Sequence, residues 1–599
     1  MRSKSRILGT TRVLLLGASV VIGAASSLGG AFAADVLVSV GSPETPFSQN
    51  KQNEPALAVD VQHPTVLAAG ANDNIDMEAC NAGPPTNCPF TPDVGSSGVY
   101  FSFDSGDTWT QPTYRGLTAR DCLGDADPAV TTDVCVAHPG PIGTLPHYAD
   151  AGLISDGDAA LAFGPVPDAN GDFAWDNGSR LYYANLTSNV SVSETTTFKG
   201  FEAIAVSRID GDPALTPAIV ADEENWLDPV IVSKQSSATF ADKEQLWVDN
   251  AESSPFFGNA YVCFARFQGS GAAPMTLATS TDGGDTWSSK QVSPAHNVAP
   301  RKFGQSGCTI RTDSEGVVYV FYEQFQDPEK FLPPNGSHFM IKSFDGGQSW
   351  TRPQLIQTIT DPCYALQFDG AIDRCVQDGI AGARNDLAAS PSISIANGAP
   401  TGAGATDEIV LNWTGFNGGT SEHVFVRTTT NGGDSWSPRV AVERAGDRGM
   451  YTAPAFSPDG GDIYLVYNAF TTPYRDDTTS PRGLVGVVLH ADVGANGLPG
   501  AWTQLHRGAV GDPRASSQNN IVMEFLGDYV YAAATNDDAV AVWNDVRDGA
   551  VCGPVQSWRA DMQEDSASFP EGRPEIQQEC PATFGNTDIF AWSGADPTP

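Results

Sequence analysis

The stretch that decides the fold is SFDSGDTW, from Ser102 to Trp109, because its pattern returns along the chain. Three close copies are STDGGDTW (Ser280 to Trp287), SFDGGQSW (Ser343 to Trp350) and TTNGGDSW (Thr429 to Trp436). A weaker copy, SPDGGDIY, runs from Ser457 to Tyr464. Self-similarity of this kind indicates a repeat architecture, in which each repeat is one supersecondary unit.

Each copy has the residues of a tight hairpin turn. An Asp or Asn side chain can hydrogen-bond the backbone two residues further on and so close a turn. Glycine adopts the left-handed backbone that such a turn requires, and the Trp then begins the next strand and packs back across the hairpin. We therefore assign a structural role to the fixed positions of the motif, which are Asp104, Trp109, Asp282, Trp287, Asp345, Trp350, Asn431 and Trp436.

A second repeated unit consists of an apolar strand, a turn and another apolar strand that ends in polar residues. Its seven copies begin at Pro55, Ala159, Gln245, Cys308, Pro391, Pro454 and Ile521. A third strand follows each copy, as in GVYFSFD, and the stretch after each eight-residue motif supplies a fourth.

Seven four-stranded units in an all-β chain predict a β-propeller, with six blades as the second choice. Closure into a ring removes the free sheet edges that a long β chain would otherwise expose. We expect the strand from Asp35 to Val40 to pair with the last blade and fasten the ring. Two stacked β-sandwich domains are the alternative, but no linker-like low-complexity stretch divides the sequence.

The first 33 residues have the layout of a secretory signal peptide. A basic start from Arg2 to Arg12 precedes an apolar run from Val13 to Ala25, and Ala31-Phe32-Ala33 fits an A-x-A cleavage site. A membrane anchor is the alternative, although the run is short for a span of roughly 20 residues. We expect a signal peptide over 1–33 and a single mature domain over 34–599, located outside the cell, in the periplasm or at the cell surface.

The chain is strongly acidic, with 71 Asp and Glu against 33 Lys and Arg and a formal charge of −38. This balance argues against nucleic acid and anionic membrane surfaces as partners. Calcium is a possible cofactor, and the acidic loops Asn72 to Cys80 and Asp121 to Asp133 are candidate positions, although neither matches an EF-hand. A solvated acidic surface is the simpler explanation. We expect a monomer with no membrane span after signal removal.

All ten cysteines follow the signal segment, which favours disulfides in an exported protein. Their order along the chain predicts the pairs Cys80–Cys88, Cys122–Cys135, Cys263–Cys308, Cys363–Cys375 and Cys552–Cys580. No C-x-x-C is present and the eight histidines show no metal-ligand spacing, so the pattern does not indicate zinc.

The eight-residue motifs and the order of strands resemble the sialidase superfamily, also called Asp-box or BNR-repeat propellers, over residues 40 to 595. The resemblance implies that the motifs lie on the outer part of the blades and that three arginines bind a substrate carboxylate. The first family arginine begins an Arg-Ile-Pro run, which here reads Asn53-Glu54-Pro55. Arg266 and Arg547 are candidates for the others. Loss of the first arginine argues against sialic acid hydrolysis.

The second strands of the units end at equivalent places, so their terminal residues should ring the central funnel. These residues are Asp73, Asn185, Arg266, Glu323, Trp413, Asn468 and Asp545, with Arg547 close by. The set predicts a sugar site with Trp413 as a stacking face and Arg266, Arg547 and Asn468 as further binding groups. Glu323 and Asp545 are the preferred catalytic pair for glycoside hydrolysis, together with Asp73.

Two classes of function follow from this pattern. The first is an exported carbohydrate-active enzyme, either a glycoside hydrolase of the exo-sialidase-like kind or a polysaccharide lyase. The second is a non-catalytic extracellular binding or scaffold propeller. In both classes the expected partner is a carbohydrate or glycoconjugate.

Overall fold

The computed structural model describes residues 35–43, 49–78, 91–122, 135–191, 197–233, 235–269, 272–295, 303–326, 333–368, 373–385, 387–417, 421–516, 526–564, 572–574 and 576–598. The predicted signal peptide, the pair Cys80–Cys88 and most of the loop Asp121 to Asp133 lie outside these residues.

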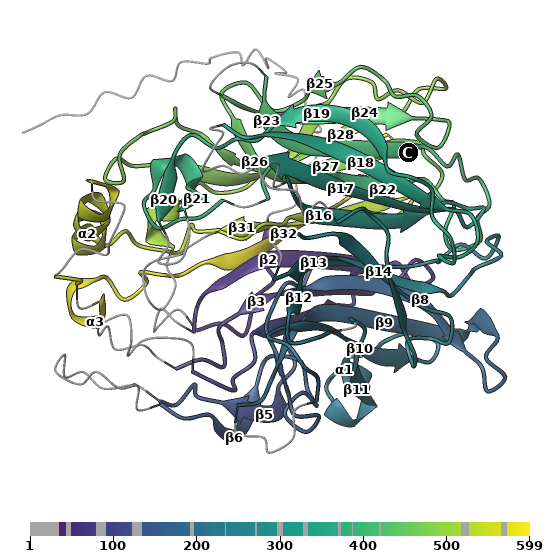
Figure 1. The fold of residues 1–599 in the computed structure, drawn as a ribbon, viewed down its shortest axis with the longest axis horizontal. Coiled ribbons are helices and arrows are strands. Elements are labelled where there is room, and N and C mark those ends of the chain that lie inside the picture. Colours follow the sequence, from purple (N-terminus) through teal and green to yellow (C-terminus); the bar gives the residue numbers. More distant parts are fainter. Residues whose placement is uncertain are drawn as a thin grey trace, which may run out of the picture. The chain divides into compact units, whose positions relative to one another are not determined.

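The described chain folds into seven antiparallel blades (Figure 1). Within each blade, the strands are given from the innermost to the outermost. Blade 1 contains β2 (Gln52–Val59), β3 (Leu67–Asp73) and β4 (Ser97–Ser102), and Thr110 adds a single bridge to Phe101. Blade 2 contains β8 (Ala160–Pro167), β9 (Phe173–Asn189), β10 (Ala203–Gly211) and β11 (Trp226–Ile231), and β7 (Leu153–Ser155) also pairs with β9. Blade 3 contains β12 (Thr239–Val248), β13 (Ala260–Gln268), β14 (Met275–Ser280) and β15 (Ser288–Gln291).

The remaining four blades have the same order. Blade 4 contains β16 (Phe303–Thr312), β17 (Val318–Gln326), β18 (Asn335–Ser343) and β19 (Gln354–Thr360). Blade 5 contains β22 (Ser392–Ile395), β23 (Ile409–Phe416), β24 (Glu422–Thr429) and β25 (Val440–Ala441). Blade 6 contains β26 (Arg448–Phe456), β27 (Asp462–Phe470), β28 (Leu484–Asp492) and β29 (Thr503–Arg507). Blade 7 contains β30 (Tyr531–Ala534), β31 (Asp538–Asp545), β32 (Asp588–Ala595) and β1 (Val36–Leu37).

The other elements are short and belong to the connections. One hairpin consists of β5 (Tyr114–Thr118) and β6 (His138–Ile142). A second hairpin consists of β20 (Leu366–Phe368) and β21 (Asp373–Cys375). The α-helices are α1 (Pro217–Val220), α2 (Gly553–Glu564) and α3 (Ile576–Glu579), and 3-10 turns cover Glu223–Asn225, Gln377–Gly379 and Pro513–Ala515. None of the helices among the described residues is long and apolar enough to span a bilayer.

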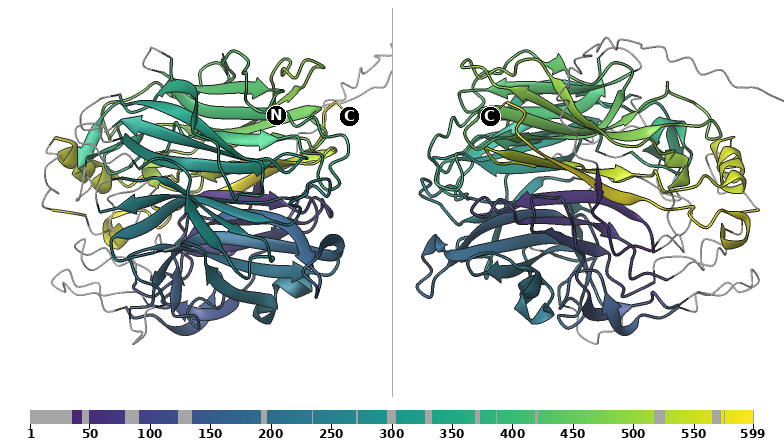
Figure 2. Two further views of the ribbon diagram at one scale, coloured as in Figure 1. Left: turned by 45° about the vertical axis from the view of Figure 1, so that its right-hand side comes forward. Right: turned by 180° about the vertical axis from the view of Figure 1, so that it is seen from behind.

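The first strands of the blades form a closed inner ring. Contacts run from β2 to β8, β12, β16, β22, β26 and β30 in turn, and β30 contacts β2 again. The yellow strand β32 therefore lies beside the purple strand β2 in Figures 1 and 2. A narrow channel of about 100 Å³ runs inside the ring and is lined from all seven first strands. The seven-bladed propeller predicted from the repeats is confirmed.

The ring is fastened by strands from both ends of the chain. Val36 pairs with Ala591 and Leu37 with Phe590, so β1 completes blade 7 as predicted. The backbone N–H of Val38 also donates to the carbonyl of Ile589 at 2.8 Å. Strands from the two ends of the chain thereby share blade 7 and close the ring.

The repeated turns have one hydrogen-bond pattern. The Asp104 carboxylate accepts from the Ser102 hydroxyl at 2.8 Å and from the backbone N–H of Thr108 at 2.9 Å. The Ser102 hydroxyl in turn accepts from the N–H of Gly106 at 2.9 Å. The Asp104 carboxylate therefore bonds the backbone four residues further on, at Thr108, and not two residues further on as predicted. The left-handed Gly106 lies between Asp104 and Thr108 and turns the chain back toward the carboxylate.

The predicted cysteine pairs within the described residues are disulfides in the structure, namely Cys122–Cys135, Cys263–Cys308, Cys363–Cys375 and Cys552–Cys580. Three of them close local segments. Cys263 lies on β13 and Cys308 on β16, so that disulfide joins blade 3 to blade 4.

Candidate functional site

Four of the seven inner strands are distorted in the part nearer to where they begin. Bulges interrupt the pairing of β2, β12, β16 and β26 with their second strands. The residues within them have left-handed backbones, with φ of 55° at Glu54, 58° at Lys243, 57° at Gly307 and 49° at Tyr451. Asp158, just before β8, has φ of 55°. Bulges redirect side chains and recur beside functional sites, so this end of the ring is the candidate site.

Three of these residues meet Asp528 close to the axis, and we call the four side chains the axial cluster: Glu54, Asp158, Lys243 and Asp528. The Lys243 ammonium lies 3.1 Å from the Asp158 carboxylate, 2.9 Å from that of Asp528 and 3.5 Å from that of Glu54. All four side chains are buried. Residues from blades 1, 2, 3 and 7 are thus joined by one cation.

The axial cluster holds its charges by mutual compensation. Burial alone lowers the pKa of the Lys243 ammonium, but the surrounding carboxylates outweigh it and raise that pKa well above its usual value. Burial and the Asp158 charge raise the pKa of Glu54 well above normal. Burial opposes ionisation of Asp158, but Lys243 and a hydrogen bond from Glu54 lower its pKa. The cluster therefore favours the charged forms of Lys243 and Asp158 and the protonated form of Glu54.

Asparagines next to the cluster orient these groups. The Asn72 amide donates to Glu54 at 2.7 Å and to Asn53 at 2.8 Å, and its oxygen accepts from the N–H of Asp158 at 2.8 Å. The N–H of Asp528 donates to Glu54 at 3.1 Å. Blades 1, 2 and 7 are thereby linked at the ring entrance, which makes the geometry rigid before any ligand binds.

A cavity of about 640 Å³, which we call the main cavity, opens beside the axial cluster between blades 1 and 2. Its size lies within the roughly 300–1,000 Å³ of small-molecule sites. Five carboxylates and three cationic side chains line it: Asp93, Asp156, Asp158, Glu202 and Asp242, with Lys51, Lys243 and Arg384. Amides of Asn53, Asn72 and Asn74 add hydrogen-bonding groups, and Phe201, 78% exposed, contributes an aromatic ring at its wall.

The acids of the main cavity titrate over separate pH ranges. Burial, and then the neighbouring Asp242, Asp156 and Asp158 carboxylates, raise the pKa of Glu202 to about 9. Burial raises the pKa of Asp242 and of Asp156 to about 7. Near pH 8 the cavity therefore holds a protonated Glu202 beside an ionised Asp242, which is the combination that general acid–base chemistry needs.

The carboxylates predicted from the sequence lie on second strands, one strand further from the axis. Asp73 is fully buried and accepts from Gln52, Tyr100 and Gln111. Glu323 accepts from Ser390 at 3.2 Å, and Asp545 accepts from Trp543 at 3.0 Å. Within the part of the chain that the structure describes, their hydrogen-bond partners do not overlap, and none of the three lines the main cavity. Their catalytic role stays a prediction.

The predicted binding groups are engaged in packing and internal bonds. Trp413 is 1% exposed, enclosed by His338 and Phe425, and so offers no open ring face to a sugar. Asn468 is fully buried and donates to the carbonyl of Asn544 at 3.0 Å. Arg547 forms ion pairs with Asp35 and Asp545. Arg266 lies on β13 and does not line the main cavity.

Sequence reasoning missed the axial cluster because it followed the ends of the second strands. The first strands begin at the same edge of each blade and lie nearer the axis, as the pairing of Asn53 with Asn72 shows. A signal existed: Asn53-Glu54-Pro55, Gly157-Asp158-Ala159 and Asp242-Lys243-Glu244 place charged residues directly beside the apolar stretches of three first strands.

The acidic loop that begins at Asn72 binds protein groups where it is described. The Asp76 carboxylate pairs with Arg120 and accepts from the N–H of Gly143 at 3.1 Å and the hydroxyl of Thr144 at 2.8 Å. Burial raises the pKa of Asp76 to about 6 despite these partners. Calcium therefore stays a prediction for this loop.

Comparison with known proteins finds fold similarity alone. No family model matches, and no curated protein matches. A Hadza microbial sialidase is similar with a TM-score of 0.38 and 11% identity, over 69% of this chain and 63% of that one, less than two thirds of its length. An α-L-arabinofuranosidase from Fusarium graminearum has a TM-score of 0.35 and 11% identity, over 73% and 92% of the two chains. The intramolecular trans-sialidase of Ruminococcus gnavus has a TM-score of 0.35 and 13% identity, over 72% and 94%.

Proposed function

We propose that this chain is an exported glycoside hydrolase whose active site is the main cavity. The observation that carries the proposal is the pair Glu202 and Asp242, two carboxyl groups in one cavity whose pKa values are about 9 and about 7. Environments that separate the pKa values of two carboxyl groups assign one as acid and the other as base or nucleophile.

Each group has a defined role in this proposal. Glu202 is protonated at neutral pH and donates its proton to the oxygen of the leaving sugar. Asp242 is ionised above about pH 7 and either attacks the anomeric carbon or activates a water molecule. The exposed ring of Phe201 packs on the apolar face of a sugar, and the asparagine amides bind its hydroxyl groups.

The charge of the main cavity supports neutral or amine-bearing sugars as substrates. Five carboxylates face three cationic side chains, and burial followed by the Arg559 charge lowers the pKa of Lys51 to about 7. Above about pH 7, where Asp156 and Asp242 are ionised and Lys51 has lost its proton, negative charge exceeds positive charge in the cavity and would repel a carboxylated sugar. Asn53, at the place of the first family arginine, offers an amide and no positive charge.

Export of a single mature domain over residues 34–599 belongs to the same proposal. It is supported by the layout of residues 1–33 and by four disulfide bonds, which persist in oxidising compartments.

The test is turnover of a glycan panel by the full mature chain, with neutral, amine-bearing and sialylated oligosaccharides. We expect Glu202→Gln and Asp242→Asn to lower kcat by about 10²- to 10⁴-fold. The rate should fall below about pH 7 and above about pH 9. Asp537→Asn is the matched control, because Asp537 is exposed and does not line the cavity.

Two outcomes decide against the proposal. If no glycan is turned over although the protein is folded, the non-catalytic binding function is preferred. If Glu323→Gln abolishes turnover and Glu202→Gln does not, the active site lies at the second-strand residues predicted from the sequence.

A further inference from the structure

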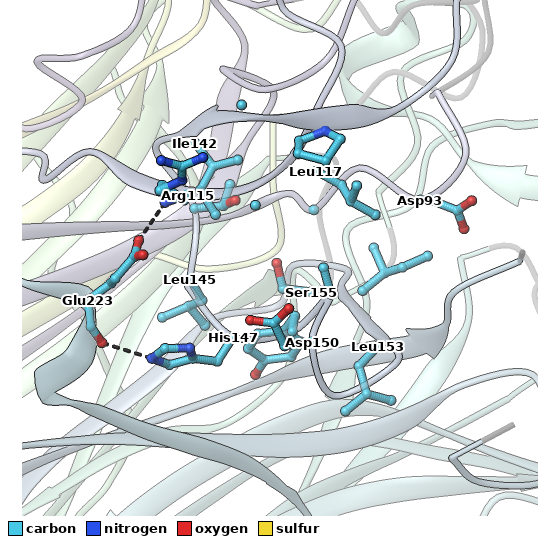
Figure 3. A pocket seen from close by; sticks show the side chains of 18 of the residues that line it. Asp93, Arg115, Leu117, Ile142, Leu145, His147, Asp150, Leu153, Ser155 and Glu223 are labelled. Carbon is cyan, nitrogen blue, oxygen red and sulfur yellow. Dashed lines mark hydrogen bonds between the residues drawn. The ribbon is translucent and has the colours of Figure 1, made fainter. Parts of the chain in front are cut away.

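A second cavity of about 320 Å³, which we call the outer cavity, lies next to the main cavity (Figure 3). The hairpin β5–β6, the segment from Thr144 to Ser155 and the 3-10 turn at Glu223 form its walls. Figure 3 shows Arg115, His147, Asp150 and Glu223 around the cavity, with Leu117 and Leu153 among the apolar side chains.

The two cavities share part of their walls. Asp93 and Ile154 line both of them, and the neighbours Gly95 and Ser96 line the outer and the main cavity respectively. Asp93 is held in place, since its carboxylate accepts from the N–H of Ser191 at 2.6 Å and from its hydroxyl at 2.7 Å. The two cavities are therefore neighbours, with Asp93 and Ile154 between them.

The outer cavity is formed without a ligand. Its hairpin is anchored to blade 2, because the Tyr114 hydroxyl donates to the carbonyl of Val220 at 2.8 Å and accepts from Trp226 at 3.0 Å. The N–H of Arg115 donates to the Glu223 carboxylate at 2.6 Å. Walls fixed in this way lower the entropic cost of binding.

The lining matches one face of a sugar ring and its hydroxyl groups. Apolar side chains of Leu117, Ile142, Leu145 and Leu153 line the cavity from two sides, together with the exposed Arg115 (Figure 3). His147 Nε2 lies 2.8 Å from the carbonyl oxygen of Glu223 and donates a hydrogen bond to it. Sugar sites combine such apolar contacts with a few oriented polar groups.

We infer that the outer cavity is a distal subsite, and that the substrate is an oligosaccharide or polysaccharide of neutral sugars. This inference rests on the proposed function of the main cavity. A chain long enough to occupy both cavities gains binding energy from remote sugar units, and that energy can raise the rate at the reacting bond.

The first experiment measures kcat/KM for neutral xylo-, cello-, manno- and arabino-oligosaccharides of two to six units. We expect at least a tenfold rise from two to four units for the wild type. Leu117→Trp fills the outer cavity and should abolish that rise without changing turnover of the two-unit substrate. Leu355→Trp, on an exposed part of β19, is the matched control.

The second experiment measures binding of the same oligosaccharides by calorimetry, with Glu202→Gln as the background. We expect Leu117→Trp to weaken binding of four-unit chains at least tenfold. Arg115→Ser is a second variant, which removes the guanidinium but keeps the hydrogen bond from the backbone N–H of residue 115 to Glu223. Arg352→Ser, at another exposed arginine, is its control.

The two proposals fail in different ways. Turnover that does not depend on chain length, or four-unit binding that Leu117→Trp leaves unchanged, overturns the distal subsite while the hydrolase proposal stands. Absence of any turnover by the wild type overturns the hydrolase proposal, and calorimetry then still decides whether the outer cavity binds sugar.

Discussion

At the scale of single residues, Lys243 is the one cation within bonding distance of three carboxylates from different blades in the described structure. Its left-handed backbone aims the side chain at the axis. A buried charge of this kind stabilises the fold only while its partners are present, because each partner is itself desolvated.

Replacing this cation should therefore destabilise the ring. We expect Lys243→Met to lower the free energy of unfolding by about 3–5 kcal/mol, because it leaves buried carboxylates uncompensated. Glu54→Gln is the matched variant, with a smaller loss expected, because burial raises the pKa of Glu54 well above its usual value and so disfavours its charged form. Urea unfolding measures both. Equal stability of Lys243→Met and wild type would show that the cluster is not an ionic centre.

The raised pKa of Glu202 predicts that the stability of the fold depends on pH. Its pKa is about 9 in the folded protein against an ordinary value of 4.5, so the folded state binds the proton more tightly. Stability from this group is present below about pH 4.5 and is lost as the pH rises toward 9. Urea unfolding from pH 5 to 9 should show this decline in the wild type and a shallower one in Glu202→Gln. Identical slopes would contradict the burial of a protonated carboxyl group.

At the scale of elements, the eight-residue turn is a local unit that works with Asp or Asn. Asn431 accepts from the Thr429 hydroxyl at 2.9 Å and from the N–H of Ser435 at 3.0 Å. Asp282 accepts in the same way from Ser280 and Thr286. The pattern depends on the acceptor oxygen more than on its charge.

Two substitutions of Asp282 test whether the turn needs the charge of this side chain or only its acceptor oxygen. Asp282→Ala removes the acceptor of the Thr286 N–H, and we expect a loss of about 1–2 kcal/mol of unfolding free energy. Asp282→Asn should retain most of the stability, because Asn431 makes the same bonds in blade 5. Thermal unfolding of the two variants side by side is the measurement. An Asn variant as unstable as the Ala variant would mean that the charge is essential.

At the scale of the whole molecule, the blades are joined by more than side-chain packing. The β1 strand closes blade 7, and Cys263–Cys308 connects blades 3 and 4 over a separation of 45 residues. A covalent link of this length restricts the unfolded chain, which favours the closed ring.

Removing that link should weaken the ring as a whole. The double variant Cys263→Ala/Cys308→Ala should lose about 4 kcal/mol by the chain-entropy estimate. Both sites are buried and small, so alanine avoids a new polar group. Denaturant unfolding under non-reducing conditions is the measurement. A loss below 1 kcal/mol would show that interblade packing alone keeps blades 3 and 4 together.

The repeats alone determined the blade architecture. Hairpin turns and apolar strands are set by contacts a few residues apart. The seven copies of the apolar strand–turn–strand unit, together with SFDSGDTW and its copies, therefore predicted seven blades, and the start of the chain predicted the closing strand β1. Local order also placed the pairs Cys122–Cys135, Cys363–Cys375 and Cys552–Cys580, and Cys263 and Cys308 remained for each other; all four pairs are disulfides in the described residues.

The tertiary structure decided where the candidate site lies. Side-chain direction at a strand end depends on bulges and on left-handed residues such as Glu54 and Lys243, which no local pattern reveals. Which carboxyl groups keep their protons depends on burial and on neighbours from other blades, as for Glu202 and Asp242. Short-range order along the chain therefore predicted the blades, and long-range closure of the ring determined the chemistry at its entrance.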